Sequence, residues 1–295
     1  MNKTAMNVFF RAILAATFLA ASAVAQATLQ EPGDAYGGVK YRIELAELKL
    51  LATNGNVAVQ YNLGVMYQLG RGVMQDYKAA AAWYRMAAGQ GHAVAQYNLG
   101  MMHYSGQGIT QDTRAAAVLF RMAAEQGLAV AQNNLGVMYT SGEGVAQDYQ
   151  EAMSWYRKAA EQGLAIAQNN VAVMYMNGQG VAQDYHEAMS WCRKAAELGS
   201  AEAQNSLGVM YFKGRGIPAD PVQANMWFTL AALAGHKKAQ AAKEYVETSM
   251  NHEQIQEAQM LVREWLTKHP DLSRMSHEFE RTLTNSREDA AREII

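Results

Sequence analysis

The feature that most constrains this chain is an internal repeat with a spacing of 36 residues. Glycine returns at one position of the repeat and tryptophan at another, with Leu119 once in place of tryptophan. These markers are Gly55, Gly91, Gly127, Gly163, Gly199 and Gly235, and Trp83, Trp155, Trp191 and Trp227. A fixed period in this range is typical of stacked units that bury their apolar faces only against neighbours. The repeat therefore predicts a solenoid.

Each repeat is predicted to be two helices joined by a tight loop. In the copy at 128–163, apolar residues follow helical spacing before Gly142, where glycine tolerates the left-handed end of a helix. Asp148 is suited to begin the second helix as its N-cap, and Glu151 completes a capping-box pattern. In the last copy Asp220 precedes Pro221, and proline is favoured at the first helical position. The fold class is therefore all-α, with tandem helix-loop-helix repeats.

Glycine also stands inside the predicted first helices, where it costs about 1 kcal/mol relative to alanine. The positions are Gly64, Gly100, Gly136 and Gly208, with Ala172 in the remaining copy. A cost repeated in this way indicates a steric requirement, and we expect close backbone approach of the adjoining helix.

The N-terminus has the pattern of a signal peptide over residues 1–27. Lys3 and Arg11 precede a short apolar run, and small residues then allow cleavage after Ala25 or Ala27. An uncleaved anchor is the alternative, but the apolar run is short for a membrane span. We therefore expect a periplasmic or secreted protein with no stable membrane insertion after cleavage.

The remaining boundaries follow from the repeat. Residues 28–55 are expected to form a linker and a half-repeat helix, the latter from Tyr41 to Ala52. Five full repeats follow over 56–235, a degenerate capping repeat over 236–267, and a polar, poorly ordered tail over 268–295. The formal net charge of −2 gives no indication of a nucleic-acid partner.

The first helices are expected to share a face that the stacking does not use. It combines aromatic, aliphatic and amide side chains, a mixture suited to binding a peptide. The candidate partner-binding residues are Tyr61, Asn62, Tyr97, Asn98, Met101, Tyr104, Asn133, Asn134, Asn169, Asn170, Asn205 and Phe212.

No metal site, cofactor or catalytic residue is expected. A methionine stripe that includes Met138 has the period of core packing, although thioethers also bind soft metals. The G-x-G loops lack the GK[ST] of a phosphate-binding loop, and His186 and His252 lack the second histidine of a zinc helix. Cys192 is expected to be a buried, inert thiol, with an intermolecular disulfide as the alternative.

The segments LGVMY, SGEGVAQDY and EAMSWYRKAAEQG are similar to the Sel-1-like repeat, a relative of the tetratricopeptide repeat. The closing QIQEAQMLVREW also resembles the C-terminal ends of such arrays. The resemblance implies a right-handed α/α superhelix whose first helices line a concave groove used as an adaptor surface. Bacterial members are often exported. Departures occur at Thr113, Leu119 and Cys192, and a single cysteine excludes the subfamily that staples each repeat with a disulfide.

The resemblance leaves two interpretations of the ladder formed by Asn62, Asn98, Asn134 and Asn170. These amides either clamp a peptide backbone, as in tetratricopeptide grooves, or bond only to loops of the next repeat, because buried amides need partners in both cases.

For the whole chain, the leading hypothesis is an exported, non-enzymatic scaffold that binds a protein or peptide partner. The alternatives are a cell-wall-directed hydrolase related to cysteine-rich family members, and a secreted effector that engages a host protein.

Overall fold

The computed structural model describes residues 37–270, 275, 277 and 279–281, and this part of the chain contains helices and no strand. The predicted signal peptide lies outside these residues, as does most of the segment beyond Pro270. The chain divides into two compact units, one ending at Gln162 and the other beginning at Gly163. Each is described by itself.

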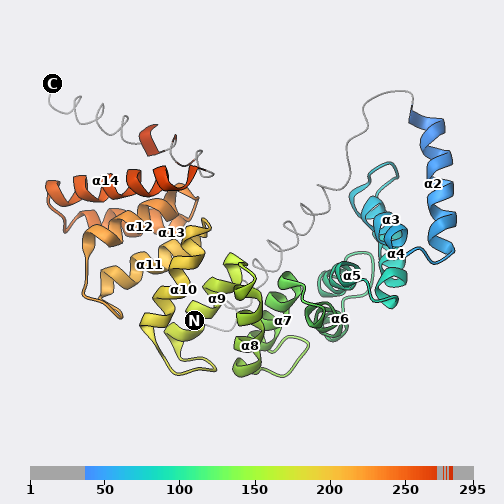
Figure 1. The fold of residues 1–295 in the computed structure, drawn as a ribbon, viewed down its shortest axis with the longest axis horizontal. Coiled ribbons are helices and arrows are strands. Elements are labelled where there is room, and N and C mark those ends of the chain that lie inside the picture. The colour runs from blue at the N-terminus through green and yellow to red at the C-terminus, as the bar shows by residue number, and fades with distance from the viewer. Residues whose placement is uncertain (1–36, 271–274, 276, 278, 282–295) are drawn as a thin grey trace. The chain divides into compact units, whose positions relative to one another are not determined.

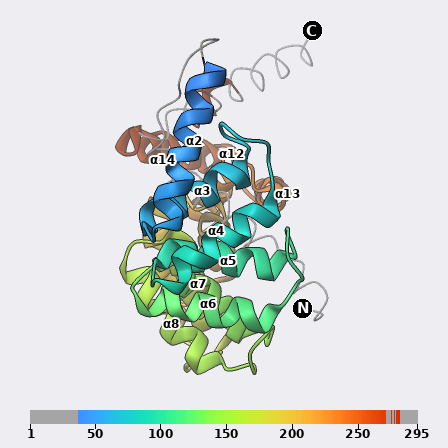
Figure 2. The same ribbon diagram turned by 90° about the vertical axis from the view of Figure 1, so that its right-hand side faces the viewer.

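Unit 1 contains a single helix and three hairpins (Figures 1 and 2). The single helix is α2 (Gly37–Thr53), and the hairpins are α3 (Val57–Leu69) with α4 (Tyr77–Gly89), α5 (Ala93–Ser105) with α6 (Thr113–Glu125), and α7 (Ala129–Ser141) with α8 (Tyr149–Glu161). We call α3, α5 and α7 first-type helices and α4, α6 and α8 second-type helices. Each first-type helix packs on the second-type helix of its own hairpin, and α5 and α7 also pack on that of the preceding hairpin.

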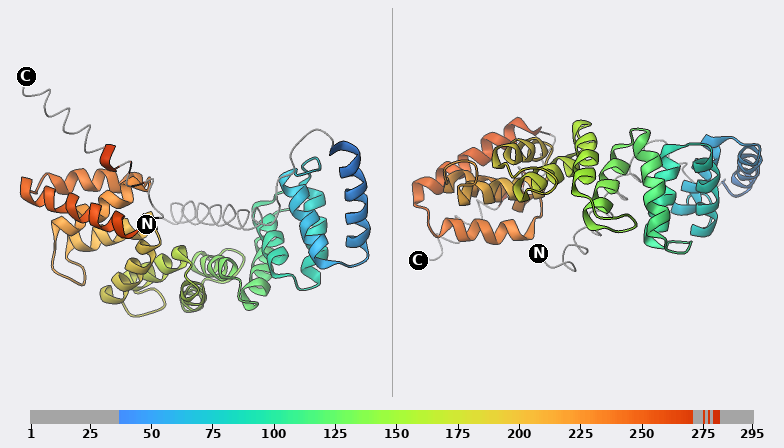
Figure 3. Two further views of the ribbon diagram at one scale, coloured as in Figure 1. Left: turned by 45° about the horizontal axis from the view of Figure 1, so that its top comes forward. Right: turned by 90° about the horizontal axis from the view of Figure 1, so that it is seen from below.

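Unit 2 repeats this arrangement with three further hairpins (Figure 3). They are α9 (Ala165–Asn177) with α10 (Tyr185–Glu197), α11 (Ala201–Lys213) with α12 (Pro221–Leu233), and α13 (Lys237–Glu247) with α14 (His252–Lys268). Helices α9, α11 and α13 are of the first type. In the last hairpin both helices contact α12, so that α13 and α14 cover the apolar side of the repeat before them.

The predicted N-cap and helix-end signals are confirmed at the atomic level, but the predicted capping box is not, because the backbone N–H of Asp148 donates to the carbonyl of Tyr139 at 2.9 Å and not to Glu151. Asp148 Oδ1 accepts hydrogen bonds from the backbone N–H groups of Gln150 and Glu151, at 2.9 and 3.0 Å. Gly142 ends α7 with a φ of 74°, and its N–H donates to the carbonyl of Met138. Pro221 is the first residue of α12. A reciprocal capping box is present at the start of α14, between Asn251 and Gln254.

The glycines inside the first-type helices admit an aromatic ring from the partner helix. A methyl group at Gly136 would lie 2.7 Å from Cδ1 of the buried Tyr156. The expected close approach is confirmed, but it is made by a ring and not by backbone. The same pairing joins Gly64 to Tyr84, Gly100 to Phe120 and Gly208 to Phe228.

The fourth repeat changes both members of this pair. Ala172 stands at the glycine position, and the buried Cys192 stands at the ring position on the facing helix α10. A smaller side chain at position 192 makes room for the extra methyl group. This explains why alanine is accepted in this repeat alone.

In three of the hairpin loops, a second glycine rests against the hairpin before it. A methyl group at Gly108 would lie 2.5 Å from the backbone carbon of Tyr77, and one at Gly144 would overlap the carbonyl group of Thr113. In unit 2, Gly216 meets Tyr185 in the same way. These glycines have positive φ, so both the backbone conformation and the contact favour glycine.

The ends of the chain differ from expectation in two respects. Helix α2 begins at Gly37, so part of the predicted linker is helical. Within the predicted tail, Phe279 is buried and Glu280 bonds Arg263 of α14 at 2.8 Å, so these described residues are ordered. Among the described helices, none is sufficiently long and apolar to cross a membrane.

Candidate partner-binding face

The structure separates the twelve candidate residues into exposed and buried positions. Tyr61, Asn205 and Phe212 are partly exposed, and Asn62 is exposed. The others are buried: Tyr97, Asn98, Met101, Tyr104, Asn133, Asn134, Asn169 and Asn170. Burial of eight candidates shows that the first-type helices use much of the predicted face for contacts that are already made.

The asparagine ladder connects consecutive first-type helices in unit 1. Asn134 Nδ2 on α7 donates to Tyr97 Oη on α5 at 3.3 Å and lies 3.6 Å from Met101 Sδ. One repeat earlier, burial raises the pKa of Tyr61, and a hydrogen bond with Asn98 opposes the rise. Asn133 Nδ2 also donates to Asn134 Oδ1. Asn98 and Asn134 therefore bond side chains of the preceding repeat, whereas the second interpretation had expected partners in the loops of the next repeat.

The hydroxyls of the buried tyrosines on the second-type helices find their polar partners on the first-type helices. Tyr84 Oη donates to Gln68, and Tyr156 Oη lies 3.2 Å from Thr140 Oγ1. Burial raises the pKa of both tyrosines, so their hydroxyls remain protonated. Where phenylalanine replaces tyrosine, at Phe120, the equivalent partner position holds Tyr104 instead of a short polar residue.

Tyr97 and Tyr104 are also committed to contacts within unit 1. The ring of Tyr97 lies 5.6 Å from that of Phe120, centre to centre. The hydroxyl of Tyr104 donates to Glu143 in the next hairpin loop at 2.6 Å. Side chains held in this way stabilise the stack of repeats.

Unit 2 presents an aromatic pair on two successive first-type helices. Phe212 of α11 and Tyr245 of α13 meet edge to face, with ring centroids 5.8 Å apart and planes at 80°. Tyr245 is 66% exposed, and Asn205 lies two turns before Phe212 on the same side of α11. Sequence reasoning missed Tyr245 because the sixth repeat is degenerate. The available signal was its position one repeat after Val209 of the predicted face.

Sequence reasoning also missed a ladder of glutamines that stabilises the stacking. Gln60, Gln96, Gln132 and Gln204 each donate from Nε2 to a backbone carbonyl near the end of a preceding helix, which is α2 for Gln60 and the second helix of the preceding hairpin for the others. Gln90, Gln126 and Gln162 donate to three of them at 2.7 to 2.8 Å. A polar residue recurring once per repeat among apolar neighbours was the signal that identifies them.

Burial shifts the pKa of two further titratable side chains, Cys192 and His92. Burial raises the pKa of the Cys192 thiol to about 12, which keeps it protonated and unreactive. Burial lowers the pKa of His92, whose Nδ1 accepts the N–H of Ala95 at 3.2 Å as the N-cap of α5. Within the described part of the chain, no three histidine, cysteine, aspartate or glutamate side chains gather as a metal site would require.

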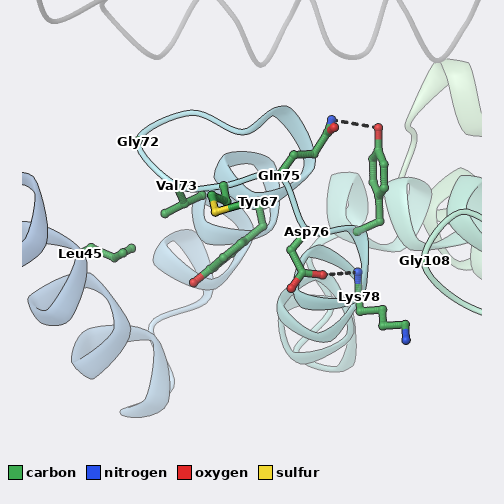
Figure 4. Close-up of a pocket in the computed structure, with 10 residues that line it drawn as sticks. Leu45, Tyr67, Gly72, Val73, Gln75, Asp76, Lys78 and Gly108 are labelled. Carbon is green, nitrogen blue, oxygen red and sulfur yellow. Dashed lines mark hydrogen bonds between the residues drawn. The ribbon is translucent and has the colours of Figure 1, made fainter.

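A pocket of about 750 Å³ opens between α2 and the α3–α4 loop (Figure 4). Its polar groups serve the local fold, because Asp76 accepts the backbone N–H of Lys78 at 2.9 Å and Gln75 donates to Tyr77 Oη at 2.9 Å. None of the twelve candidate residues lines it. The pocket is therefore separate from the predicted face.

Tandem α-hairpins that recur along the chain and pack through repeated small and aromatic residues define an α-solenoid repeat protein. The Sel1 repeat model matches five consecutive segments, at 57–92, 93–128, 129–164, 165–200 and 201–236. These segments make up more than half of the chain, which belongs to the Sel1 repeat family. Proteins of this family are generally protein-interaction scaffolds.

Two solved structures are similar over most of the chain. One is a protective antigen present in uropathogenic Escherichia coli strains that displays an SLR fold, with 34% identity and a TM-score of 0.67. The match covers 78% of this chain but 49% of the E. coli chain, so this chain spans about half the length of that relative. The other is a Sel1 repeat protein from Oxalobacter formigenes, with 33% identity, a TM-score of 0.67, and coverage of 78% and 93%. No curated protein matched the chain.

Proposed function

We propose that this chain is an exported, non-enzymatic scaffold that binds a protein or peptide partner on the face of its first-type helices. The observation that carries the proposal is the aromatic pair of Phe212 and Tyr245 in unit 2. Aromatic side chains supply large contact areas and are enriched among the residues that dominate binding energy. Tyr245 is 66% exposed and its ring packs edge to face against that of Phe212, so the pair offers a large aromatic surface to a partner.

The surroundings of the pair suit a peptide or an extended protein segment. Asn205 lies two turns from Phe212 on the same side of α11. Lys238 is exposed two turns before Tyr245 on α13, and Thr248 is exposed directly after the end of that helix. Aromatic anchors flanked by amide, hydroxyl and ammonium groups combine apolar contact with hydrogen bonding to a backbone. Unit 1, taken by itself, has the exposed Asn62 and the partly exposed Tyr61 on α3.

Export is supported by the signal-peptide pattern of residues 1–27 and by one relative. The E. coli structure is described as a protective antigen present in uropathogenic strains. A location outside the cytoplasm is consistent with that property. A non-enzymatic role is supported by the scaffold character of Sel1 repeat proteins.

A photo-cross-linking experiment tests the binding face. A photoreactive phenylalanine analogue replaces Tyr245 in one variant and Met260 of α14 in a matched control, because both side chains are well exposed in unit 2. We expect a discrete adduct at position 245 in the cells that produce the protein, and none at position 260. Equal adducts at both positions, or none at 245, would contradict the proposal. An adduct with a protein of the producing cells supports an adaptor that acts there over an effector that engages a host protein.

A further inference from the structure

Helix α2 has the repeat position of a second-type helix, but it is not paired in a hairpin within the described residues. It lies one repeat before α4 and packs on α3, the first helix of the hairpin that follows (Figure 2). Helices α4, α6, α10 and α12 each pack on two first-type helices, that of their own hairpin and that of the next. By this comparison, α2 has one contact side for α3 and a second side for a first-type helix of its own.

The exposure of side chains along α2 identifies this second side. The residue equivalent to Leu51 is a fully buried alanine in all five Sel1 repeats, whereas Leu51 is 48% exposed. These alanines are Ala87, Ala123, Ala159, Ala195 and Ala231. Leu48 takes the place of the buried Tyr84 and is only partly buried. We call Leu48 and Leu51 the leucine face.

The side of α2 that contacts α3 is closed in the ordinary way. Ala52 is 0% exposed, and its carbonyl accepts a hydrogen bond from Gln60 Nε2 at 2.8 Å. Leu50, which is adjacent to Leu51, is 62% exposed, and its equivalents Met86 and Met122 are each 41% exposed in complete hairpins. Exposure at position 50 is therefore normal for the repeat, and exposure at position 51 is not.

A sequence typical of a first-type helix directly precedes α2. Residues 23–29 read AVAQATL, while α5 begins with AVAQYNL and α7 with AVAQNNL. The leucine of this motif is buried in both helices, as Leu99 and Leu135. Residues 30–36 then lead to α2, and they have the same length as the α5–α6 loop at 106–112.

We propose that residues 23–31 are the first-type partner of α2 and cover the leucine face in chains that retain them. Covering two leucine side chains removes apolar surface from water and so favours closure of the hairpin. Pro32 and Gly33 are turn-forming residues that suit the connection. Glu44 takes the place of the buried Ala80, but in an antiparallel pair it would lie beside this turn, within reach of water.

The proposal gives signal-peptide processing a structural consequence. Both predicted cleavage points, after Ala25 and after Ala27, lie inside the segment 23–31. Cleavage at either point removes most of the AVAQ motif and opens the leucine face. A processed chain and an unprocessed chain would therefore present different surfaces at the N-terminal end of the array.

Thiol alkylation tests the proposal, because Cys192 is the single cysteine of the chain and is buried. Cell-free synthesis without membranes supplies the full chain and a shorter chain that begins at Thr28. Each is made with Leu51→Cys on the leucine face, with Leu50→Cys as the exposed control, and with Ala87→Cys as the buried equivalent. The rate of reaction with a maleimide-linked polymer is followed by the increase in mass on a gel.

We expect Leu51→Cys to react about tenfold more slowly in the full chain than in the shorter chain, because alkylation then requires local opening. Leu50→Cys should react at one rate in both chains. Ala87→Cys and Cys192 should stay protected in both, which verifies that the repeats of each unit are folded. Equal rates for Leu51→Cys in the two chains would overturn the proposal.

A second substitution identifies the segment that provides the protection. Leu29→Asp in the full chain should restore the fast reaction of Leu51→Cys, because a carboxylate does not pack against leucine. Protection that survives Leu29→Asp would overturn the proposal, since the apolar run before residue 23 would then cover the leucine face. Neither result affects cross-linking at Tyr245.

Discussion

At the scale of single residues, four of the described hairpins close where a ring covers a helical glycine. Repeated cost at one helix position indicated a steric requirement, because intrinsic propensity alone disfavours glycine there. The sequence did not identify the ring, since Tyr156 and Trp155 are neighbours of similar character on the same predicted stripe. Nor did it indicate that Ala172 and Cys192 change together, which becomes clear once the facing positions are known.

This pairing predicts an energetic coupling between positions 136 and 156. Gly136→Ala should destabilise the protein by about 1–2 kcal/mol, because the methyl group meets a ring held by Thr140. Tyr156→Cys should cost about 3–5 kcal/mol by leaving a cavity. The double variant, which reproduces the pair at 172 and 192, should lose less than the sum by about 1 kcal/mol or more. Urea denaturation of the four proteins measures the coupling, and strict additivity would contradict it.

A second prediction concerns the histidine that caps α5. His92 accepts the N–H of Ala95 and stacks on Tyr61 at 4.7 Å, and burial holds its pKa below the ordinary value. The folded state therefore favours neutral imidazole. Its contribution to stability should be complete above pH 6.5, the ordinary value, and should be lost as pH falls through the lowered pKa.

The measurement compares the protein with His92→Asn between pH 8 and pH 5. Asparagine caps α3 at the equivalent Asn56 and does not titrate in this range. We expect the unaltered protein to lose melting temperature relative to the variant as the pH is lowered. A difference that stays constant with pH would show that His92 is not the titrating cap.

At the scale of elements, the loop glycines determine how one hairpin is seated on the next. Gly144 has a φ of 72° and approaches the carbonyl group of Thr113. Gly127 also has a positive φ, of 90°, but has open space around its Cα. Gly127→Ala should cost about 1–2 kcal/mol from backbone strain alone. Gly144→Ala should cost about 1–3 kcal/mol more, because it adds a clash between repeats. Thermal denaturation separates the two effects, and equal losses would argue against the contact.

Helix boundaries were predictable where the chain provides specific end signals. Asp148 and Gly142 have side-chain and backbone chemistry that stops or starts a helix, and both act as predicted. The start of α2 has no comparable signal. It begins with Gly37 and Gly38, which are poor helix formers, so the sequence favoured a later start near Tyr41.

For the whole molecule, the fold was predictable because periodicity, caps and turn residues all indicate the same hairpin. The candidate partner-binding face was less predictable from the sequence. Spacing within one helix shows which residues share a side, but not how much of that side the next repeat uses. Tyr97 and Asn134 are consequently buried against each other, whereas Phe212 and Tyr245 retain exposed surface. No pattern in one chain specifies the chemistry of a partner.

The most direct test of the proposed scaffold is the affinity of the partner captured at position 245 for three purified variants. Tyr245→Ala and Phe212→Ala remove the two rings, and Met260→Ala is the exposed control on α14. Loss of an aromatic anchor should weaken binding by about 1 kcal/mol or more, or at least about fivefold, while the control binds normally. Unchanged affinity after removal of either ring, with helix content intact, would contradict a partner-binding role for the first-type helices.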